Sequence, residues 1–137
     1  MGPAYEKPAL LKFPTNGSGA MGYLTVANSL ENVPFAIRRV FWTYFTPNNV
    51  TRGRHAHYRT EMVIIAVHGC IRLNAELLSG EKFDFTLDSP EQGVYLPPLC
   101  WHLMEYSHDA VQLVLASTDF DPSDYIRSYS AFRQLHS

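Results

Sequence analysis

The sequence has little charge, few cysteines and no long apolar run. Charged residues make up 18% of the 137 positions and the formal net charge is −2, so the chain lacks the basic surface by which proteins bind nucleic acids. Cys70 and Cys100 stand among apolar residues, which favours reduced buried thiols over a disulfide framework. No apolar run approaches the roughly 20 residues of a membrane-spanning helix, and the N-terminal segment lacks the apolar centre of a signal peptide. We therefore expect one cytoplasmic domain, residues 1–137, that contacts neither nucleic acid nor membrane.

Short apolar or alternating segments, separated by turns, fill most of the chain. Segment 35–45 is rich in aromatic and β-branched residues, and an extended strand there places Arg39 and Phe41 on one face and Trp42 and Tyr44 on the other. Further strands are expected at 61–69, 70–77, 83–87, 94–97, 98–107 and 110–117, with one or two more in the N-terminal arm. Roughly seven to ten short strands at this spacing predict an all-β fold, which we assign to the cupin-type double-stranded β-helix, a jelly-roll barrel. The mouth of such a barrel is an ordinary place for a ligand.

The last segment, 123–137, has a different pattern. Its apolar residues stand near helical spacing: Tyr125, Ile126, Tyr129 and Phe132. Asp121 or Ser123 is available as an N-cap. This pattern predicts a short C-terminal helix.

Two histidines stand one residue apart in the segment TRGRHAHYRTEM, residues 51–62. If a strand runs through this segment, alternate residues share one face, and these are His55, His57, Arg59 and Glu61. Another histidine, His102, follows in PPLCWH, which we expect to form the facing strand. The fold therefore gathers several groups that can bind a metal or transfer a proton.

Three interpretations of these groups stay open at this point. As metal ligands, the set is His55, His57, Glu61 and His102, which suits iron, manganese, nickel or zinc, and H-x-H-x-x-x-E is the spacing of metal-dependent cupins. In the second interpretation the group is an acid/base site, in which a neutral histidine transfers a proton near neutral pH. As ordinary strand residues, the side chains are satisfied by hydrogen bonds. The other histidines stand beside turns or at the C-terminus, where we expect them to be exposed: His68, His108 and His136.

Several segments, in this order, are similar to the nucleotide-sugar 3,4-ketoisomerases, the family that acts on dTDP-4-keto-6-deoxyglucose. They are FAIRRVFWTYF, TRGRHAH, EMVIIAVHGCIRL, LDSPEQGVYLPPLCWHLMEYS and VLASTDFDPSDYIRSYSAF, between about Gly22 and Phe132. The chain differs from the family at Tyr58 and Met62, where lysine and glutamine are common. The resemblance implies a cupin-fold homodimer with exchanged N-terminal strands. It also implies that the enzyme moves a ketone from C4 to C3 of the sugar through an enediol, with neither a metal nor an organic cofactor, in deoxysugar biosynthesis for polysaccharides, glycoproteins or antibiotics.

The resemblance further implies a role for individual residues. His57 matches the family's base and carries the proton between C3 and C4, with His55 and Tyr44 as further catalytic groups. The implied substrate-binding residues are Tyr23, Arg39, Arg52, Arg54 and His102. Arginine suits the diphosphate because its guanidinium pairs with two phosphate oxygens. Two other functions stay open: a metal-dependent cupin such as a small oxygenase, and a non-catalytic sugar-binding cupin.

Overall fold

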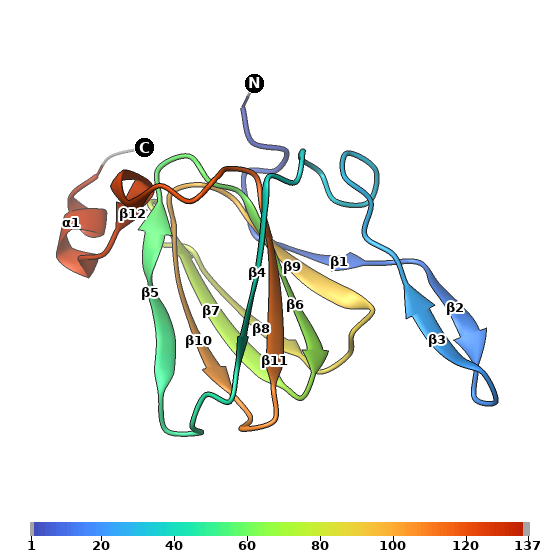
Figure 1. The fold of residues 1–137 in the computed structure, drawn as a ribbon. Helices are drawn as coiled ribbons and strands as arrows, with labels where there is room; N and C mark the ends of the chain where they lie inside the picture. The colour runs from blue at the N-terminus through green and yellow to red at the C-terminus, as the bar shows by residue number, and fades with distance from the viewer. Residues whose placement is uncertain (1, 136–137) are drawn as a thin grey trace.

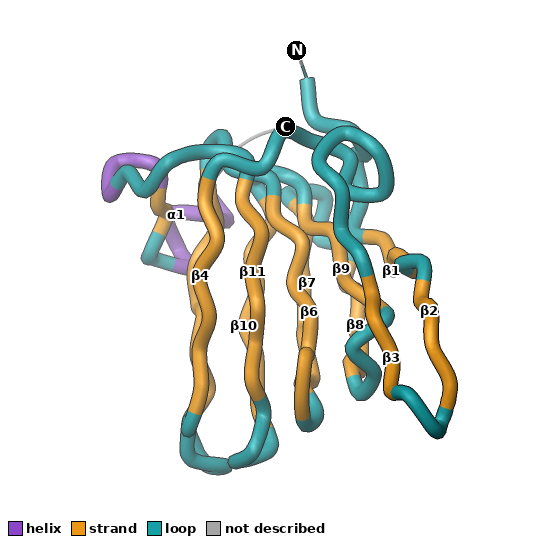
Figure 2. The backbone as a smooth tube through the Cα atoms, turned by 45° about the vertical axis from the view of Figure 1, so that its right-hand side comes forward, coloured by secondary structure: helices purple, strands orange, loops and turns teal. Residues whose placement is uncertain are grey.

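The computed structural model describes residues 2–135, which form two five-stranded antiparallel sheets packed face to face and a separate two-stranded hairpin (Figure 1). One sheet has the strand order β1 (Ala9–Lys12), β9 (Gln92–Leu96), β6 (Met62–His68), β11 (Val111–Ala116) and β4 (Arg39–Tyr44). The other has the order β12 (Tyr125–Ile126), β5 (Thr51–His57), β10 (Cys100–Tyr106), β7 (Ile71–Leu77) and β8 (Lys82–Leu87). Figure 2 shows the strands of one sheet lying behind those of the other. The expected all-β jelly-roll barrel is confirmed.

Apolar side chains fill the space between the sheets. On β7, Ile71 and Leu73 are buried while Arg72 between them is exposed, which is the alternation expected of a strand with one solvent-exposed face. Strand β6 is instead buried on both faces, because Val63 and Ile65 pack in a second cluster on the outer side of its sheet. Burial on both faces explains the uninterrupted apolar run in this part of the sequence.

The N-terminal arm contains a hairpin that projects away from the barrel (Figure 1). Its strands are β2 (Thr15–Ser18) and β3 (Gly22–Thr25). With β1, the arm has three strands where one or two were expected, and residues 2–135 contain twelve strands in all. Met21, Tyr23 and Leu24 on this hairpin are exposed.

The C-terminal segment is only partly helical. It forms a 3₁₀ turn, η1 (Pro122–Asp124), then β12, and then the short helix α1 (Tyr129–Gln134). The cap of α1 is Ser128, which accepts a hydrogen bond from the Ala131 amide, whereas Asp121 caps η1. The expected helix therefore exists but does not begin at residue 123, because the backbone of residues 125 and 126 pairs with β5 instead. No helix among the described residues is long and apolar enough to cross a membrane.

Candidate active site

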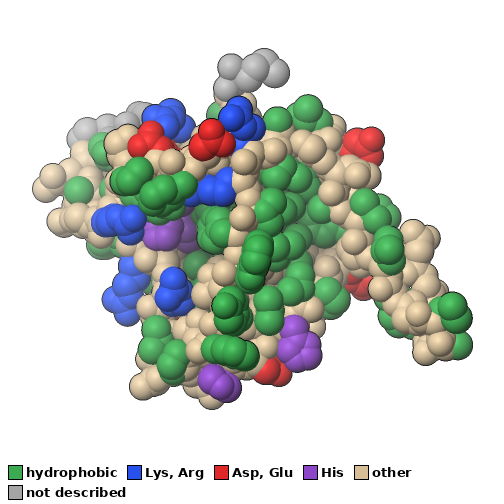
Figure 3. Space-filling view, viewed as in Figure 1, with side chains coloured by type: hydrophobic (Ala, Val, Ile, Leu, Met, Phe, Trp, Pro, Cys, Tyr) green, Lys and Arg blue, Asp and Glu red, His purple; other side chains and the backbone are tan. Residues whose placement is uncertain are grey.

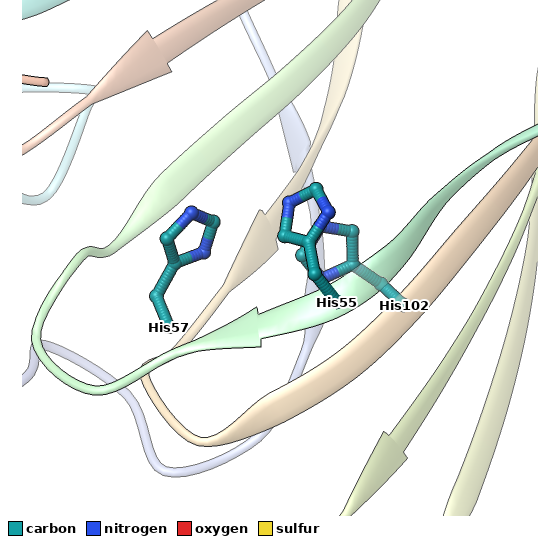
Figure 4. A group of neighbouring side chains, drawn as sticks. All are labelled: His55, His57 and His102. Carbon is teal, nitrogen blue, oxygen red and sulfur yellow. The ribbon is translucent and has the colours of Figure 1, made fainter. Parts of the chain in front are cut away.

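Three histidines gather at one end of the barrel (Figure 4). His55 and His57 come from β5, and His102 comes from the neighbouring strand β10, where it lies opposite His55. The ring of His55 is 4.9 Å from the ring of His57 and 4.6 Å from that of His102, between centroids. One nitrogen of each ring lies within 4.8 Å of a nitrogen of the other two. His57 and His102 are buried, and His55 is partly buried.

A β-bulge in β5 sets the direction of these side chains. His102 and Leu103 are consecutive on β10, but their partners on β5 are His55 and Gly53, so Arg54 is an extra residue. Gly53 and Arg54 have left-handed backbone angles, with φ of 87° and 59°. A Cβ atom on Gly53 would lie 3.0 Å from the carbonyl oxygen of His102, so glycine also allows the two strands to approach closely.

Burial keeps the three histidines neutral near pH 7. Burial, and to a smaller extent the charges of His55, Arg39 and Arg127, lower the pKa of His57 to about 3. Burial is also the main cause of the lowered pKa values of His55 and His102. A neutral imidazole has one nitrogen with a free lone pair, which is the form that a general base requires.

Backbone carbonyl groups select the tautomer of two of the rings. Nδ1 of His55 lies 3.1 Å from the carbonyl oxygen of Gly53, and Nδ1 of His102 lies 3.1 Å from that of Cys100. A carbonyl oxygen only accepts hydrogen bonds, so we assign the proton of each ring to Nδ1. Nε2 of His55 and of His102 is then a hydrogen-bond acceptor.

Arginine side chains surround the histidines. Figure 3 shows a histidine patch on the surface with Lys and Arg side chains around it. Arg39 on β4 and Arg127 after β12 both lie close enough to lower the pKa of His57. Arg38 and Arg59 are paired with carboxylates at 3.1 and 3.2 Å. Within residues 2–135, no ion pair is made by Arg39, Arg52, Arg54 or Arg127, so their charges are available to an anionic ligand.

Two buried nitrogen atoms at this site lack a hydrogen-bond partner. They are Nε2 of His57 and Nε of Arg39, and no other buried side-chain nitrogen or oxygen in the described part of the chain is unpaired. Unsatisfied buried polar atoms destabilise a fold, so they are typical of a site that a ligand completes.

Tyr125 covers the histidines, although the sequence pattern placed it in a helix. Its ring lies 4.5 Å from the ring of His57 and 5.1 Å from that of His55, between centroids. Arg127 lies over the same ring at 4.3 Å. The sequence contains the motif SDYIR, but its spacing predicts a helix. It gives no sign that Tyr125 and Ile126 pair with β5 as a two-residue strand.

The structure brings together only part of the expected site. His55, His57, His102 and Arg39 lie together, as the sequence predicted. Arg52 and Arg54 are exposed on β5, next to the bulge. Tyr44 is not brought to the histidines, because it lies on the outward face of β4 and is 56% exposed. Tyr23 lies on the projecting hairpin and is 71% exposed.

The four-ligand metal site proposed from the spacing is not assembled. Only three of its members lie within ligand distance of one another: His55, His57 and His102. The carboxylate of Glu61 instead accepts hydrogen bonds from the Tyr95 hydroxyl at 2.7 Å and the Ala4 amide at 3.0 Å. The reason is that β5 ends at His57, so the alternation of faces does not continue to Glu61.

Among the described residues, no other histidine and neither cysteine side chain belongs to the histidine cluster. His68 and His108 are exposed, as expected, while His136 lies outside the described residues. Both cysteines are free, and burial raises the pKa of Cys100 to about 12, which makes its thiol unreactive.

Comparisons with known proteins agree on one family. Residues 6–137 match the family model described as FdtA: WxcM-like, C-terminal. The chain is 38% identical over 115 residues to the TDP-4-oxo-6-deoxy-alpha-D-glucose-3,4-oxoisomerase of Aneurinibacillus thermoaerophilus, covering 82% of this chain and 81% of that one. It superimposes with a TM-score of 0.88 on QdtA, a sugar 3,4-ketoisomerase from Thermoanaerobacterium thermosaccharolyticum bound to TDP, with 32% identity and 93% of each chain covered. The TM-score is also 0.88 for WlaRB, a TDP-quinovose 3,4-ketoisomerase from Campylobacter jejuni, with 30% identity and coverage of 96% of this chain and 100% of that one. The chain therefore belongs to the FdtA family (WxcM-like, C-terminal), and its resemblance to the sugar 3,4-ketoisomerases is confirmed.

Proposed function

We propose that this protein is a 3,4-ketoisomerase that converts dTDP-4-keto-6-deoxyglucose to a dTDP-3-keto-6-deoxyhexose. The observation that carries the proposal is the pair of unpartnered buried nitrogens, Nε2 of His57 beside Nε of Arg39. In this proposal, Nε2 of the neutral His57 ring is the base and Nε of Arg39 is a cationic hydrogen-bond donor to the substrate. The relatives named above act on, or bind, TDP-linked sugars or TDP.

His57 is the base in this proposal. The C4 ketone of the substrate acidifies the proton on C3, and removal of that proton gives an enediolate. A neutral imidazole accepts the proton and returns it to C4 as an imidazolium. The reaction needs no redox cofactor, because the oxidation of C3 and the reduction of C4 occur within one molecule.

The arginines bind the anionic parts of the substrate. Arg39 and Arg127 lie beside the histidines, and Arg52 and Arg54 extend the positive charge along β5. This arrangement supports diphosphate binding on the side of the site next to β5, with His55 and His102 near the sugar oxygens. A cytoplasmic location, where nucleotide sugars are made, stays a prediction.

The hairpin and the outer face of β4 support the expected homodimer. Strand β4 is the end strand of its sheet and exposes Val40, Trp42 and Tyr44. Tyr23 and its neighbours on the hairpin are exposed. The hairpin, β2 and β3, projects away from β5 and β10, the strands that carry the histidines (Figure 1). We expect the hairpin of each subunit to cover the apolar face of its partner, so that Tyr23 contributes to a site across the interface.

A turnover assay tests the proposed reaction. The purified protein is incubated with dTDP-4-keto-6-deoxyglucose, and the sugar ring is followed by NMR. We expect a 3-keto sugar from the native protein and none from His57→Asn, while both proteins bind dTDP with similar affinity. His68→Asn, which changes an exposed histidine, is the control and should leave turnover unchanged. Nucleotide-sugar binding by the native protein without turnover would overturn the proposal and favour a sugar-binding cupin.

A further inference from the structure

The position of the His57 ring depends on the backbone that carries it. His55 and His102 each direct Nδ1 at a backbone carbonyl group, whereas Nε2 of His57 has no hydrogen-bond partner within residues 2–135. The His57 ring packs against the ring of Tyr125, 4.5 Å away between centroids. Hydrogen bonds constrain direction, whereas apolar packing is non-directional. An accurate position for this ring therefore requires that the end of its strand be firmly held.

Asp124 holds all three residues that follow His57. Strand β5 ends at His57, next to the turn that leads to β6 (Figure 4). The Tyr58 amide donates a hydrogen bond to the backbone carbonyl oxygen of Asp124 at 2.9 Å. The Arg59 amide donates one to the carboxylate of Asp124 at 2.8 Å, and the Thr60 hydroxyl donates one to the other carboxylate oxygen. A residue of the C-terminal segment thus determines how the chain leaves β5.

Asp124 is also the one buried acidic residue in the described part of the chain, with 2% of its surface exposed. Removal of a carboxylate from water is unfavourable unless hydrogen bonds and an opposite charge compensate for it. Nε of Arg59 lies 3.9 Å from this carboxylate. The Thr60 hydroxyl lies 2.6 Å from the Thr118 hydroxyl, which extends the network into the segment before η1. A buried polar network whose members are all hydrogen-bonded makes its surroundings rigid.

We infer that Asp124 is a positioning residue for the proposed base, because its bonds to residues 58–60 fix the end of β5 and with it the ring of His57; this inference rests on the proposed isomerase function. Asp124 acts through His57 rather than on the substrate. Strand β12 begins directly after Asp124 and pairs Tyr125 with His57. The Leu99 amide, just before β10, donates a hydrogen bond to the His57 carbonyl oxygen at 2.7 Å. A displacement of about 1 Å can lower the rate on the order of 100-fold, so loss of the Asp124 bonds should slow catalysis.

Three variants separate positioning from general stability. Asp124→Ala removes both hydrogen bonds to the carboxylate. Asp124→Asn keeps an oxygen for the Arg59 amide and offers an amide N–H to the Thr60 hydroxyl, which can accept as well as donate. Asp121→Ala is the control, because Asp121 caps the same turn, η1, but bonds to the side chain of Arg59 and not to its amide.

Steady-state kinetics at a temperature where each variant is folded measure the effect. We expect Asp124→Ala to lower kcat by roughly 10-fold to 100-fold, with KM within about threefold of the native value because the arginines on β4 and β5 are retained. Asp124→Asn and Asp121→Ala should keep kcat within about threefold of the native value. Native kcat in a folded Asp124→Ala protein, or an equal loss in Asp121→Ala, would overturn the positioning role. A loss in Asp124→Asn as large as in Asp124→Ala would contradict positioning by hydrogen bonds.

A second pair of variants applies if Asp124→Ala does not fold. Thr60→Val removes the hydroxyl that bonds to Asp124, and Thr118→Val removes the hydroxyl at the far end of the same network. We expect kcat to fall roughly 3-fold to 10-fold in Thr60→Val, the effect of one hydrogen bond, and to stay native in Thr118→Val. Equal kcat values would overturn the inference.

The native protein separates this inference from the proposed function. If it makes no 3-keto sugar, the isomerase proposal itself fails. Native turnover together with native kcat in Asp124→Ala contradicts only the role of Asp124.

Discussion

His55 and His102 lie directly opposite each other on β5 and β10, with their ring centroids 4.6 Å apart. Each directs Nδ1 at a backbone carbonyl oxygen 3.1 Å away, so both rings present the same nitrogen to the site. The register between β5 and β10 thus fixes the positions of His55 and His102, and the bulge at Gly53 makes that register possible. The site is therefore built into the sheet, and changes in the sheet should affect catalysis.

Gly53→Ala should lower both stability and turnover. An alanine Cβ at this position would lie 3.0 Å from the His102 carbonyl oxygen. The left-handed backbone conformation would lower the free energy of unfolding of the alanine variant by a further ~1–2 kcal/mol. Gly80→Ala is the matched control, because Gly80 has a similar φ of 92° and no atom nearer than 4.0 Å to the added Cβ. Urea unfolding and kcat measure the two effects. We expect Gly80→Ala to lose stability alone and Gly53→Ala to lose kcat as well; equal kcat values would contradict the link between the bulge and the site.

Arg39→Met should weaken dTDP binding by roughly 10-fold to 100-fold, since a charge-assisted hydrogen bond contributes about 1.5–3 kcal/mol. Methionine retains an apolar stem to pack beside Phe41 and Phe120, over whose rings the guanidinium lies. Arg38→Met is the control on the other face of the same segment, where Arg38 pairs with Asp119. Titration calorimetry with dTDP should show native affinity for Arg38→Met. Similar losses for both variants would indicate a general effect of charge rather than a specific contact.

The histidines should make the protein sensitive to acid. Burial lowers the pKa of His57 to about 3, and it lowers those of His55 and His102 from their ordinary value of 6.5. Below pH 6.5 these histidines take up protons in the unfolded chain but stay neutral in the folded chain until the pH reaches their lowered pKa values. The free energy of unfolding should therefore fall as the pH drops below about 6.5, by about 1.4 kcal/mol per pH unit for each histidine that stays neutral in the fold.

Urea unfolding between pH 7 and pH 5 measures this loss. His57→Asn removes one of the three groups, so its stability should depend less steeply on pH than that of the native protein. Identical slopes for the two proteins would show that His57 does not stay neutral as the fold is acidified.

Trp42→Glu should convert the expected dimer to monomers. Trp42 is 60% exposed on the end strand of its sheet, and a charge at the centre of an apolar interface opposes association. Lys82→Glu, at the start of strand β8 on the other sheet, is the control and should leave the dimer intact. Sedimentation velocity measures both. A native protein that sediments as a monomer would refute the exchange of hairpins.

The sequence predicts this fold and part of this site because alternation is a local property. The spacing of His55 and His57 places both side chains on one face of β5. The same alternation places Tyr44 and Arg39 on opposite faces of β4, so Tyr44 cannot join Arg39 in the site of the same subunit. The end of β5 at His57, which excludes Glu61, depends on the turn that follows it.

Tyr125 was missed for a different reason. Its apolar spacing with Tyr129 and Phe132 fits a helix, and only pairing with β5, which is distant in sequence, makes it part of a strand. Met62, where the resemblance implies a glutamine in relatives, is buried in the core between the sheets. We therefore expect this position to affect packing rather than contact with the substrate.

Incubation with dTDP-4-keto-6-deoxyglucose in deuterium oxide tests the central claim most directly. We expect a new 3-keto sugar that carries solvent deuterium at C4, where His57 delivers a proton that exchanges with solvent, and neither the product nor deuterium incorporation with His57→Asn. Recovery of unchanged substrate with deuterium at neither C3 nor C4 would contradict it.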